Sequence, residues 1–268
     1  MNIELTGKLA VVVGGTSGIN LGVAQYLAEL GANLVVVSRK QDKVDAAVTA
    51  LQALGGGSAW GFTADVRQAD DIKAGFATLH EMFGEIDILV SGAAGNFPAR
   101  AKDMSSNGFK SVMDIDLLGS FHVAQAAYPY LKKPGASVIQ ISAPQAFVPM
   151  ATQSHVCAAK AGVDMLTKTL AMEWGSEGIR VNSVVPGPIA GTEGMARLAP
   201  TEKIQQQIQL SVPLRRMGKP KDVAQVCAFL ASDYASYVSG VIMPVDGGWS
   251  LSGAAALASQ MDALLPQT

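Results

Sequence analysis

The chain has 268 residues, of which 49% are hydrophobic and 16% charged, and its formal net charge is −2. This composition excludes a disordered or coiled-coil protein, and the length suits one large domain with a substantial core. The nearly neutral charge provides no basic field for nucleic acid or for an anionic membrane surface. An anionic ligand must therefore be bound locally, by a few well-placed residues.

The ends of the chain and its cysteines bear on where the protein resides. The first residues, MNIELTGK, include Glu4 and have no apolar segment like that of a signal peptide. No run of 18 apolar residues occurs, and the final LLPQT carries no SKL- or KDEL-type signal. Cys157 and Cys227 are too few for a disulfide framework. We therefore expect a cytoplasmic protein with reduced cysteines and no membrane span.

Short apolar runs alternate with helical patterns along the chain. The strand-like runs cover residues 9–15, 33–39, 59–66, 86–94, 136–143, 179–187 and 239–248. Their valine and isoleucine content is typical of parallel strands buried on both faces. The helix-like stretches cover residues 21–30, 42–54, 69–83, 108–131, 155–175 and 220–231. This alternation predicts a single α/β domain over residues 1–268, a Rossmann-type doubly wound parallel sheet of about seven strands with helices on both faces.

The segment VVVGGTSGINLG leads from the first apolar run into the first helical stretch, with three glycines spaced four residues apart. Such a turn lets backbone N–H groups approach a pyrophosphate at a helix N-terminus. Glycine also serves ordinary tight turns, so the position after the first strand is what strengthens the prediction. We expect a dinucleotide site that includes Gly14, Thr16, Ser17, Gly18 and Ile19.

The second strand ends with Ser38 and Arg39, where NAD-dependent enzymes commonly place an acidic residue for the ribose hydroxyls. A hydroxyl and a planar guanidinium suit a 2′-phosphate instead, which predicts NADPH as the cofactor. The alternative is a solvated arginine at the end of a strand. Asp65 and Val66 end the third strand, where they are expected to contact the adenine. Asp65 has the alternative role of capping the helix that follows.

These motifs together resemble the short-chain dehydrogenase/reductase family over nearly the whole chain. The family's TGxxxGxG turn is matched by residues 13–20, with Asn20 in place of the third glycine, and its NNAG motif by residues 91–94. Its PG turn after the sixth strand is matched by Pro186-Gly187, with Thr192 beyond it. The resemblance implies further cofactor contacts, at Ala93, Pro186, Gly187 and Ile189.

Members of this family reduce a carbonyl with a serine, a tyrosine and a lysine, and the tyrosine protonates the oxygen next to the carbon that accepts hydride. The segment HVCAAK ends at Lys160 and places Val156 at the tyrosine position. Ala143 falls at the serine position, with Ser142 one residue earlier, and Asp116 replaces a family asparagine.

One tyrosine–lysine pair elsewhere has the family spacing. Tyr128 and Lys132 are four residues apart, but they precede the fifth strand and have Pro129 between them. We therefore interpret this segment as the end of a helix. Tyr26, Tyr234 and Tyr237 lie in segments equally remote from the expected site.

Two interpretations of Val156 remain. A decayed site leaves no reason to keep Lys160, yet the segment AAKAGVDMLTKTLAMEW is intact. The other interpretation is a reaction that places its proton far from its hydride, such as reduction of an α,β,γ,δ-unsaturated thioester. There the hydride adds to the far end of the conjugated system and the proton goes to a carbon near the thioester. Such a site needs an oxyanion donor and a separate acid.

Five segments strengthen the second interpretation, because together they resemble 2,4-dienoyl-CoA reductases of the peroxisomal type within this family. They are residues 93–97, 113–121, 155–164, 181–194 and 246–249. The resemblance implies NADPH-dependent reduction of a 2,4-dienoyl-CoA to a 3-enoyl-CoA, in the β-oxidation of unsaturated fatty acids. A reductase of another enoyl or keto substrate, and a catalytically silent NADP(H)-binding protein, remain as alternatives.

The same resemblance implies three catalytic residues. Lys160 is expected to hold the nicotinamide ribose, and Asp116 to position a proton-donating water; the alternative for Asp116 is a hydrogen-bond hub inside a helix. Asp246 matches a second carboxyl of the subfamily, although its VDGG turn is widespread and a structural role is an equal alternative.

The expected substrate contacts follow the fourth strand and precede a helix. Asn96 is the candidate oxyanion donor, Phe97 lies beside it, and His155 contacts the substrate or serves as a cap or packing residue. No histidine–cysteine cluster has the spacing of metal ligands, so no metal is expected.

The segment from Ile189 to Arg216, rich in glycine and proline, is expected to form a lid over an acyl-CoA substrate. Residues 108–131 and 155–175 carry apolar side chains at more positions than one core face needs. Family members pair these helices between subunits, which implies a homotetramer. The alanine-rich tail from Gly253 onward is expected to be a surface or interface element.

Overall fold

The structure, a computed structural model, describes residues 2–254. Its centre is a sheet of seven parallel strands in the order β3-β2-β1-β4-β5-β6-β7. The strands are β1 Leu9–Val13, β2 Asn33–Ser38, β3 Ala59–Thr63, β4 Ile88–Ser91, β5 Ser137–Ile141, β6 Arg180–Pro186 and β7 Ile242–Val245. Each lies inside one of the seven predicted runs, so the doubly wound sheet is confirmed. Most of the predicted tail lies outside the described residues.

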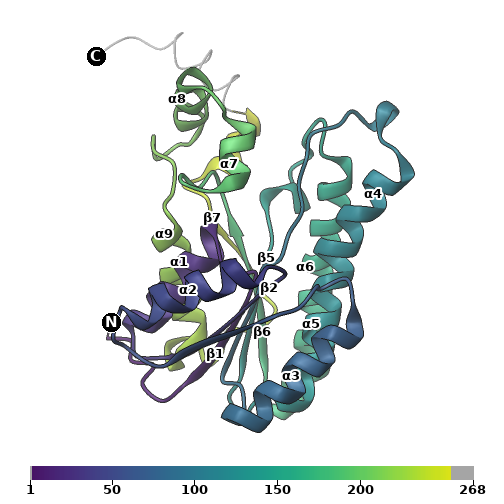
Figure 1. Ribbon diagram of the computed structural model, residues 1–268. Helices are drawn as coiled ribbons and strands as arrows, with labels where there is room; N and C mark the ends of the chain where they lie inside the picture. Colours follow the sequence, from purple (N-terminus) through teal and green to yellow (C-terminus); the bar gives the residue numbers. More distant parts are fainter. Residues whose placement is uncertain (1, 255–268) are drawn as a thin grey trace.

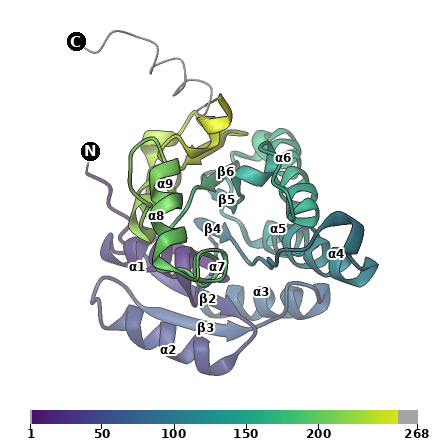
Figure 2. The same cartoon turned by 90° about the horizontal axis from the view of Figure 1, so that it is seen from above.

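Helices cover both faces of the sheet (Figures 1 and 2). One layer contains α1 (Gly18–Glu29), α2 (Gln41–Gln52) and α9 (Pro220–Ala231), and the other contains α3 (Ala69–Phe83), α5 (Gly119–Ala127) and α6 (Ser154–Trp174). Helix α4 (Ser106–Val112) continues the second layer, while α7 (Glu193–Leu198) and α8 (Glu202–Ser211) stand above the strand ends.

The valine-rich strands are explained by burial on both faces. Within β1 and β2, Val12 and Val36 pack into the core under α1 and α9, whereas Val11 and Val35 pack into the core under α3, α5 and α6. All four are at most 1% exposed. Burying such a side chain contributes roughly 1.5–3 kcal/mol relative to leaving it exposed. If polar and apolar residues alternated along these strands, one face of the sheet would be polar, and the helices on that face would have no apolar surface to pack against.

The predicted helix over residues 108–131 is divided. A π-helical turn, Met113–Leu118, separates α4 from α5, and a 3-10 turn, Tyr128–Tyr130, ends the segment. The prediction missed this interruption because apolar periodicity continues through it. A π turn inside an α-helix is often found at a functional site.

The predicted lid segment contains two helices, whose bounds were not predicted. Thr192 and Thr201 cap α7 and α8, and their hydroxyls accept the backbone N–H groups of Met195 at 3.1 Å and Ile204 at 3.4 Å. These threonines were the available signal, since threonine is a favoured N-cap. Helix α8 has no buried residue, and most of its residues are polar.

Strands β1 and β4 are neighbours in the sheet, but the segments that follow them lie on opposite faces of the sheet. In open α/β sheets, ligands bind in the crevice at the carboxyl ends of the strands at this point. Figure 2 looks onto these ends and shows α7 and α8 at the rim. Within residues 2–254, no helix combines the length and apolar character needed to cross a membrane.

Candidate active site

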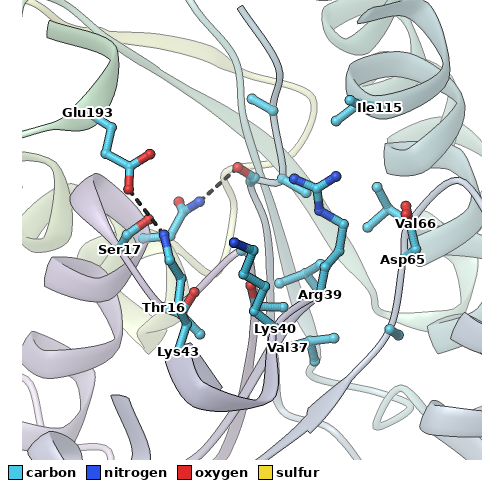
Figure 3. Close-up of a pocket in the computed structure, with 18 residues that line it drawn as sticks. Thr16, Ser17, Val37, Arg39, Lys40, Lys43, Asp65, Val66, Ile115 and Glu193 are labelled. Carbon is cyan, nitrogen blue, oxygen red and sulfur yellow. Dashed lines mark hydrogen bonds and ion pairs between the residues drawn. The ribbon is translucent and has the colours of Figure 1, made fainter. Parts of the chain in front are cut away.

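A cleft of about 270 Å³ lies at the carboxyl ends of β1, β2, β3 and β4 (Figure 3). We call it the cofactor cleft. Its lining includes eight of the residues predicted to bind cofactor: Gly14, Thr16, Ser17, Ser38, Arg39, Asp65, Val66 and Ala93. Gly18, Ile19 and Lys160 line a second, adjoining pocket of about 450 Å³, which we call the inner pocket.

The glycines at the base of the cleft permit a close approach between β1 and β4. Gly14 has φ +78°, and a Cβ at this position would lie 3.1 Å from the backbone nitrogen of Ala93. A Cβ at Gly92 would lie 2.4 Å from the side chain of Asn20, whose Nδ2 donates to the Gly92 carbonyl at 2.8 Å. Asn20, at the position of the third family glycine, thus fastens the start of α1 to the end of β4.

The start of α1 offers free donors to an anion. Ser17 is the N-cap in an extended conformation, and its hydroxyl makes no capping hydrogen bond. The first backbone bond of the helix runs from the N–H of Leu21 to the carbonyl of Ser17, at 3.2 Å. The amides before Leu21 have no carbonyl one turn earlier, so a phosphate group fits here electrostatically and by hydrogen bonding.

The rim of the cofactor cleft is basic. Arg39 is joined there by Lys40 and Lys43, which were not predicted as site residues although RKQDK places three cations within five positions. Figure 3 shows the three side chains next to one another, with Lys40 between Lys43 and Arg39. Lys43 forms an ion pair with Glu193, with 3.2 Å between Nζ and Oε1.

Asp65 lines the cleft but does not cap the next helix. Its Oδ1 accepts the backbone N–H of Arg67 at 3.0 Å, and the Arg67 side chain binds both of its carboxylate oxygens. The hydrogen bond from the Arg67 side chain holds the pKa of Asp65 below its usual value, with a smaller contribution from Arg39. Helix α3 begins at Ala69 without a side-chain cap. The alternative of a helix-capping Asp65 is therefore wrong.

The inner pocket brings most of the predicted catalytic and substrate residues together. Its wall includes Asn96, Phe97, Asp116, Ser142, Ala143, Val156, Lys160 and Thr192. It shares Ser17, Asn20, Arg39 and Glu193, among others, with the cofactor cleft. A ligand can therefore extend from the basic rim to the Lys160 side chain without leaving the crevice.

Lys160 and Asp116 form a buried charge pair in this wall. Their side chains are 5% and 1% exposed, and 3.4 Å separates the Lys160 Nζ from the Asp116 Oδ2. Nζ donates to the carbonyl of Ile141 at 3.0 Å, and Oδ1 of Asp116 accepts the N–H of Gly95 at 2.7 Å. The π turn carries Asp116 and is closed by a 2.6 Å hydrogen bond from the Ser120 hydroxyl to the Asp116 carbonyl. The pair is thus fixed before any ligand arrives.

The pocket wall one turn before Lys160 is apolar. Val156 is 3% exposed and packs with Val112 and Ala159. Among residues 2–254, no tyrosine lines either the cofactor cleft or the inner pocket.

Tyr128 is placed far from this wall, as expected. It belongs to the 3-10 turn that ends α5, its hydroxyl donates to Glu177, and its ring lies 4.8 Å from that of Trp174. Lys132, the other member of the pair, binds Asp87 at 3.3 Å. The interpretation of this segment as the end of a helix is confirmed.

Asp246 is not brought together with Asp116. Its two carboxylate oxygens accept the N–H groups of Gly248 and Ser250, both at 2.9 Å, and it lines neither pocket. This carboxylate stabilises the turn after β7. Its catalytic role stays a prediction, and the structural alternative accounts for both of its oxygens.

The PG turn lies next to the pockets rather than in their walls. Pro186 ends β6, the N–H of Gly187 donates to the carbonyl of Val245 at 3.1 Å, and Ile189 is 3% exposed. The carbonyl of Ile189 accepts the hydroxyl of Thr192 at 3.0 Å, and only Thr192 of this group lines the inner pocket in the described chain. Contacts of the other three with cofactor stay predictions.

Two of the three predicted substrate residues line the inner pocket, and the third lies behind them. Asn96 and Phe97 line the inner pocket, and the buried Oδ1 of Asn96 has no hydrogen-bond partner within residues 2–254. His155 is fully buried behind Phe97, with 4.6 Å between the ring centroids, and lines neither pocket. Neither of its ring nitrogens has a hydrogen-bond partner among the described residues. In this arrangement His155 packs against Phe97.

Asp164 is a buried carboxyl that the sequence analysis missed. It lies four residues after Lys160 on α6 and is 7% exposed, and the Ser183 hydroxyl donates to it at 3.0 Å. Burial raises the pKa of Asp164; the hydroxyls of Ser142 and Ser183 and the charge of Lys160 oppose this effect only partly. A carboxyl one helical turn after the lysine was the available signal.

Comparisons with known proteins identify the family of the chain. A family model described as Enoyl-(Acyl carrier protein) reductase matches residues 13–250. A peroxisomal 2,4-dienoyl-CoA reductase from Arabidopsis thaliana, (3E)-enoyl-CoA-producing, is 42% identical over 256 residues, 92% of this chain and 85% of the relative. A Bacillus subtilis relative, named a probable 2,4-dienoyl-CoA reductase that produces (2E)-enoyl-CoA, is 38% identical over 90% of this chain and 96% of its own.

Solved structures show the same fold. A short-chain dehydrogenase from Bacillus anthracis is 37% identical, with a TM-score of 0.81, and the match covers 91% of this chain and 96% of the other. Levodione reductase has a TM-score of 0.88 at 28% identity, over 93% of this chain and 100% of the other. The model match and these relatives span nearly the whole chain, from the glycine-rich turn to the segment after β7. The chain belongs to the short-chain dehydrogenase/reductase family of oxidoreductases and, within it, is similar to the peroxisomal 2,4-dienoyl-CoA reductases.

Proposed function

We propose that the protein reduces a 2,4-dienoyl-CoA to a 3-enoyl-CoA with NADPH, in the β-oxidation of unsaturated fatty acids. The observation that carries the proposal is the buried Lys160–Asp116 pair, which faces a pocket whose wall is apolar at Val156. A carbonyl reductase needs an acid beside the carbon that accepts hydride. Here the wall supplies a carboxylate and an ammonium group instead.

The cofactor cleft supports a phosphorylated dinucleotide. The free N–H groups of α1 suit the pyrophosphate, and Ser38 with Arg39, Lys40 and Lys43 suits a 2′-phosphate. NADPH, when bound, supplies the hydride of the reaction. We propose that Lys160 holds the nicotinamide ribose through its ammonium group, as the family resemblance implies.

The electrons of the proposed reaction determine where the proton is needed. Hydride adds to C5 of the dienoyl chain, the π electrons move toward the thioester, and negative charge develops on its oxygen. A proton at C2 then leaves a double bond between C3 and C4, whereas a proton at C4 leaves it between C2 and C3. C4 is bonded directly to C5, whereas C2 lies two carbons further along the chain. An acid placed beside the hydride site therefore reaches C4 but is badly placed for the proton at C2 that a 3-enoyl product requires.

The inner pocket provides separate groups for the two tasks. Asn96 lies in its wall with an amide group suited to the developing oxyanion. The Oδ2 oxygen of Asp116 has no hydrogen-bond partner within residues 2–254 and lies 3.4 Å from the ammonium of Lys160. We propose that this oxygen orients the water that gives its proton to C2, while Lys160 keeps Asp116 in place.

The test is NADPH oxidation with a medium-chain 2,4-dienoyl-CoA, compared with a matched 3-ketoacyl-CoA. We expect rapid turnover of the dienoyl substrate alone and a 3-enoyl product by NMR. Turnover of the keto substrate alone contradicts the proposal and favours another keto reductase. A 2-enoyl product retains the substrate but moves the proton to C4, and silence with both substrates despite NADPH binding favours a dinucleotide-binding protein without catalysis.

A pair of variants separates Asp116 from its surroundings. Asp116→Ala should lower kcat at least tenfold and leave the Kd for NADPH within about twofold, because one positioned proton donor commonly contributes 10²–10⁴-fold. Asp114→Asn is the matched control: it lies in the same π turn but pairs at the surface with Lys110. Equal activities of the two variants would remove Asp116 from the mechanism.

We also propose that the protein is a homotetramer. Helices in the α4–α6 layer expose apolar side chains, with Leu118 at 43%, Met165 at 61% and Met172 at 85% exposure. Apolar helix faces of this kind suit contacts between subunits. Sedimentation equilibrium should give four times the chain mass, and a monomeric mass at micromolar concentration contradicts the proposal.

A further inference from the structure

One ion pair spans the cofactor cleft. Lys43 projects from the first turn of α2, and its Nζ lies 3.2 Å from the Oε1 of Glu193 at the start of α7 (Figure 3). The two residues are 150 positions apart in the chain, and both line the cleft. The segment predicted to be a lid is therefore tied to the wall that carries the basic rim.

Glu193 is a negative charge that the protein itself places among these cations. Its Oε2 lies 3.5 Å from the Arg197 Nη2, one turn later on α7. The hydrogen bond from Lys43 lowers the pKa of Glu193, and the charges of Arg197 and Lys40 add to this effect. The carboxylate is thus ionised at neutral pH, and it binds the ammonium group of Lys43.

A 2′-phosphate brought to the same rim carries about two negative charges near pH 7. Like charges repel at contact distance, so a phosphate bound to Lys43 weakens the contact between the Glu193 carboxylate and the same ammonium group. Glu193 has a second partner, Arg197, on its own helix, and this partner moves with it. The carboxylate can therefore leave Lys43 without losing every favourable contact.

We infer that Glu193 is a specificity-determining residue that competes with the 2′-phosphate of the cofactor for Lys43, so that binding of this phosphate releases α7 from α2. The inference rests on the proposed use of NADPH and extends it to the lid. NADH has no 2′-phosphate, so it leaves the ion pair in place. The cofactor with the phosphate thereby frees the segment that borders the inner pocket.

An acidic residue in the first turn of a helix also stabilises that helix by itself. Two observations separate this effect from the proposed competition. The N-terminus of α7 is already capped by the Thr192 hydroxyl, at 3.1 Å from the N–H of Met195. In addition, Lys43 lies on a different helix, so Lys43→Met removes the ion pair while the sequence of α7 stays unchanged.

The first experiment measures Kd for NADPH and NADH by fluorescence at one fixed salt concentration. An exposed ion pair contributes the equivalent of about a two- to fivefold change, so Glu193→Gln should tighten NADPH by this factor and leave NADH unchanged. Lys43→Met should weaken NADPH alone, and in the double variant the gain from Glu193→Gln should disappear. Glu29→Gln is the matched control, because it removes one charge from an exposed pair with Lys221 outside both pockets.

The second experiment follows amide hydrogen exchange in residues 193–198. Adenosine 2′,5′-bisphosphate should speed exchange in this segment, whereas adenosine 5′-monophosphate should not. Lys43→Met without ligand should already exchange as fast as the wild type with the bisphosphate. Slower exchange of α7 with the bisphosphate overturns the inference, because it means that the phosphate closes this segment rather than releasing it.

The outcomes distinguish this inference from the proposed function. Equal Kd values for NADPH and NADH in the wild type overturn the NADPH assignment and the competition with it. The wild type can prefer NADPH while Glu193→Gln changes the Kd values for NADPH and NADH by the same factor, or changes neither. This result overturns the competition for Lys43 and leaves the NADPH assignment in place.

Discussion

The buried pair of Lys160 and Asp116 gives a direct test of how this site is held together. In Asp116→Asn, the amide oxygen can still accept the N–H of Gly95, so the 2.7 Å hydrogen bond is retained. The negative charge is lost, and the Lys160 ammonium, 5% exposed, keeps only the carbonyl of Ile141 as a partner among residues 2–254. Removing one partner of a buried ion pair typically costs about 3–5 kcal/mol, because the other charge stays buried and unpaired.

We expect Asp116→Asn at the lower end of this range, about 3 kcal/mol, because the Gly95 bond persists. For a chain of this size, 1 kcal/mol shifts Tm by about 2–4 °C, so the expected loss is roughly 6–12 °C. Lys160→Met should cost a similar amount, since it leaves the Asp116 carboxylate buried. The double variant removes both charges, and its loss should fall short of the sum of the two single losses by at least about 1 kcal/mol.

The assay is urea and thermal unfolding of the four proteins without cofactor, at one protein concentration and pH 7. A matched control cycle uses Lys110 and Asp114, an exposed pair in the adjoining turn, for which a coupling of only about 0.3–0.5 kcal/mol is expected. If losses from Asp116→Asn and Lys160→Met add within about 0.5 kcal/mol, the two groups do not depend on each other and our account of the site is refuted.

Three further predictions follow from single features of the structure. Burial raises the pKa of Asp164, so the native state keeps this proton at pH values where the unfolded chain has lost it. The free energy of unfolding should therefore fall as pH rises from about 4 through the native pKa. Measurements of Tm against pH should show this dependence in the wild type and not in Asp164→Asn. Burial raises the pKa of the Cys227 thiol to about 12, so iodoacetamide at pH 8 should label Cys157 in the native protein and Cys227 only after unfolding; native labelling of Cys227 contradicts its burial. Gly92→Ala should cost about 1–3 kcal/mol, since its Cβ would lie 2.4 Å from Asn20, and Asn20→Gly should restore part of the loss in the double variant; no recovery would show that the clash lies elsewhere.

The sheet was predictable because its strands are buried on both faces. Val11 and Val12 point into different helical layers, so each run is uniformly apolar and is bounded by polar or glycine residues. Helix α3 was predicted with its observed bounds, since its apolar positions follow one face. The lid helices escaped prediction because α8 buries no side chain and α7 has only six residues.

Site residues could be predicted where they directly follow a recognisable strand. Contacts between residues far apart in the sequence could not be predicted. Arg39 follows β2 and lines the cleft as expected, but the contact of Lys43 with Glu193 joins residues 150 positions apart. The sequence could not exclude a catalytic position for Asp246 either, because the orientation of its carboxylate is set by two backbone amides of its own turn.

Val156 and Asp116 are connected by one electrostatic argument. In the family pattern, the ammonium of the lysine stabilises the ionised form of the tyrosine that acts as acid. With valine at that position, a buried Lys160 would face an apolar wall with a single carbonyl as its partner, a costly arrangement for a charge. Asp116 supplies the missing counter-charge, with its Oδ2 3.4 Å from the Lys160 Nζ. On our proposal, the loss of the tyrosine and the presence of the aspartate are therefore one change: the lysine keeps its place beside the cofactor, and the acid moves from the hydride site to the water that Asp116 holds.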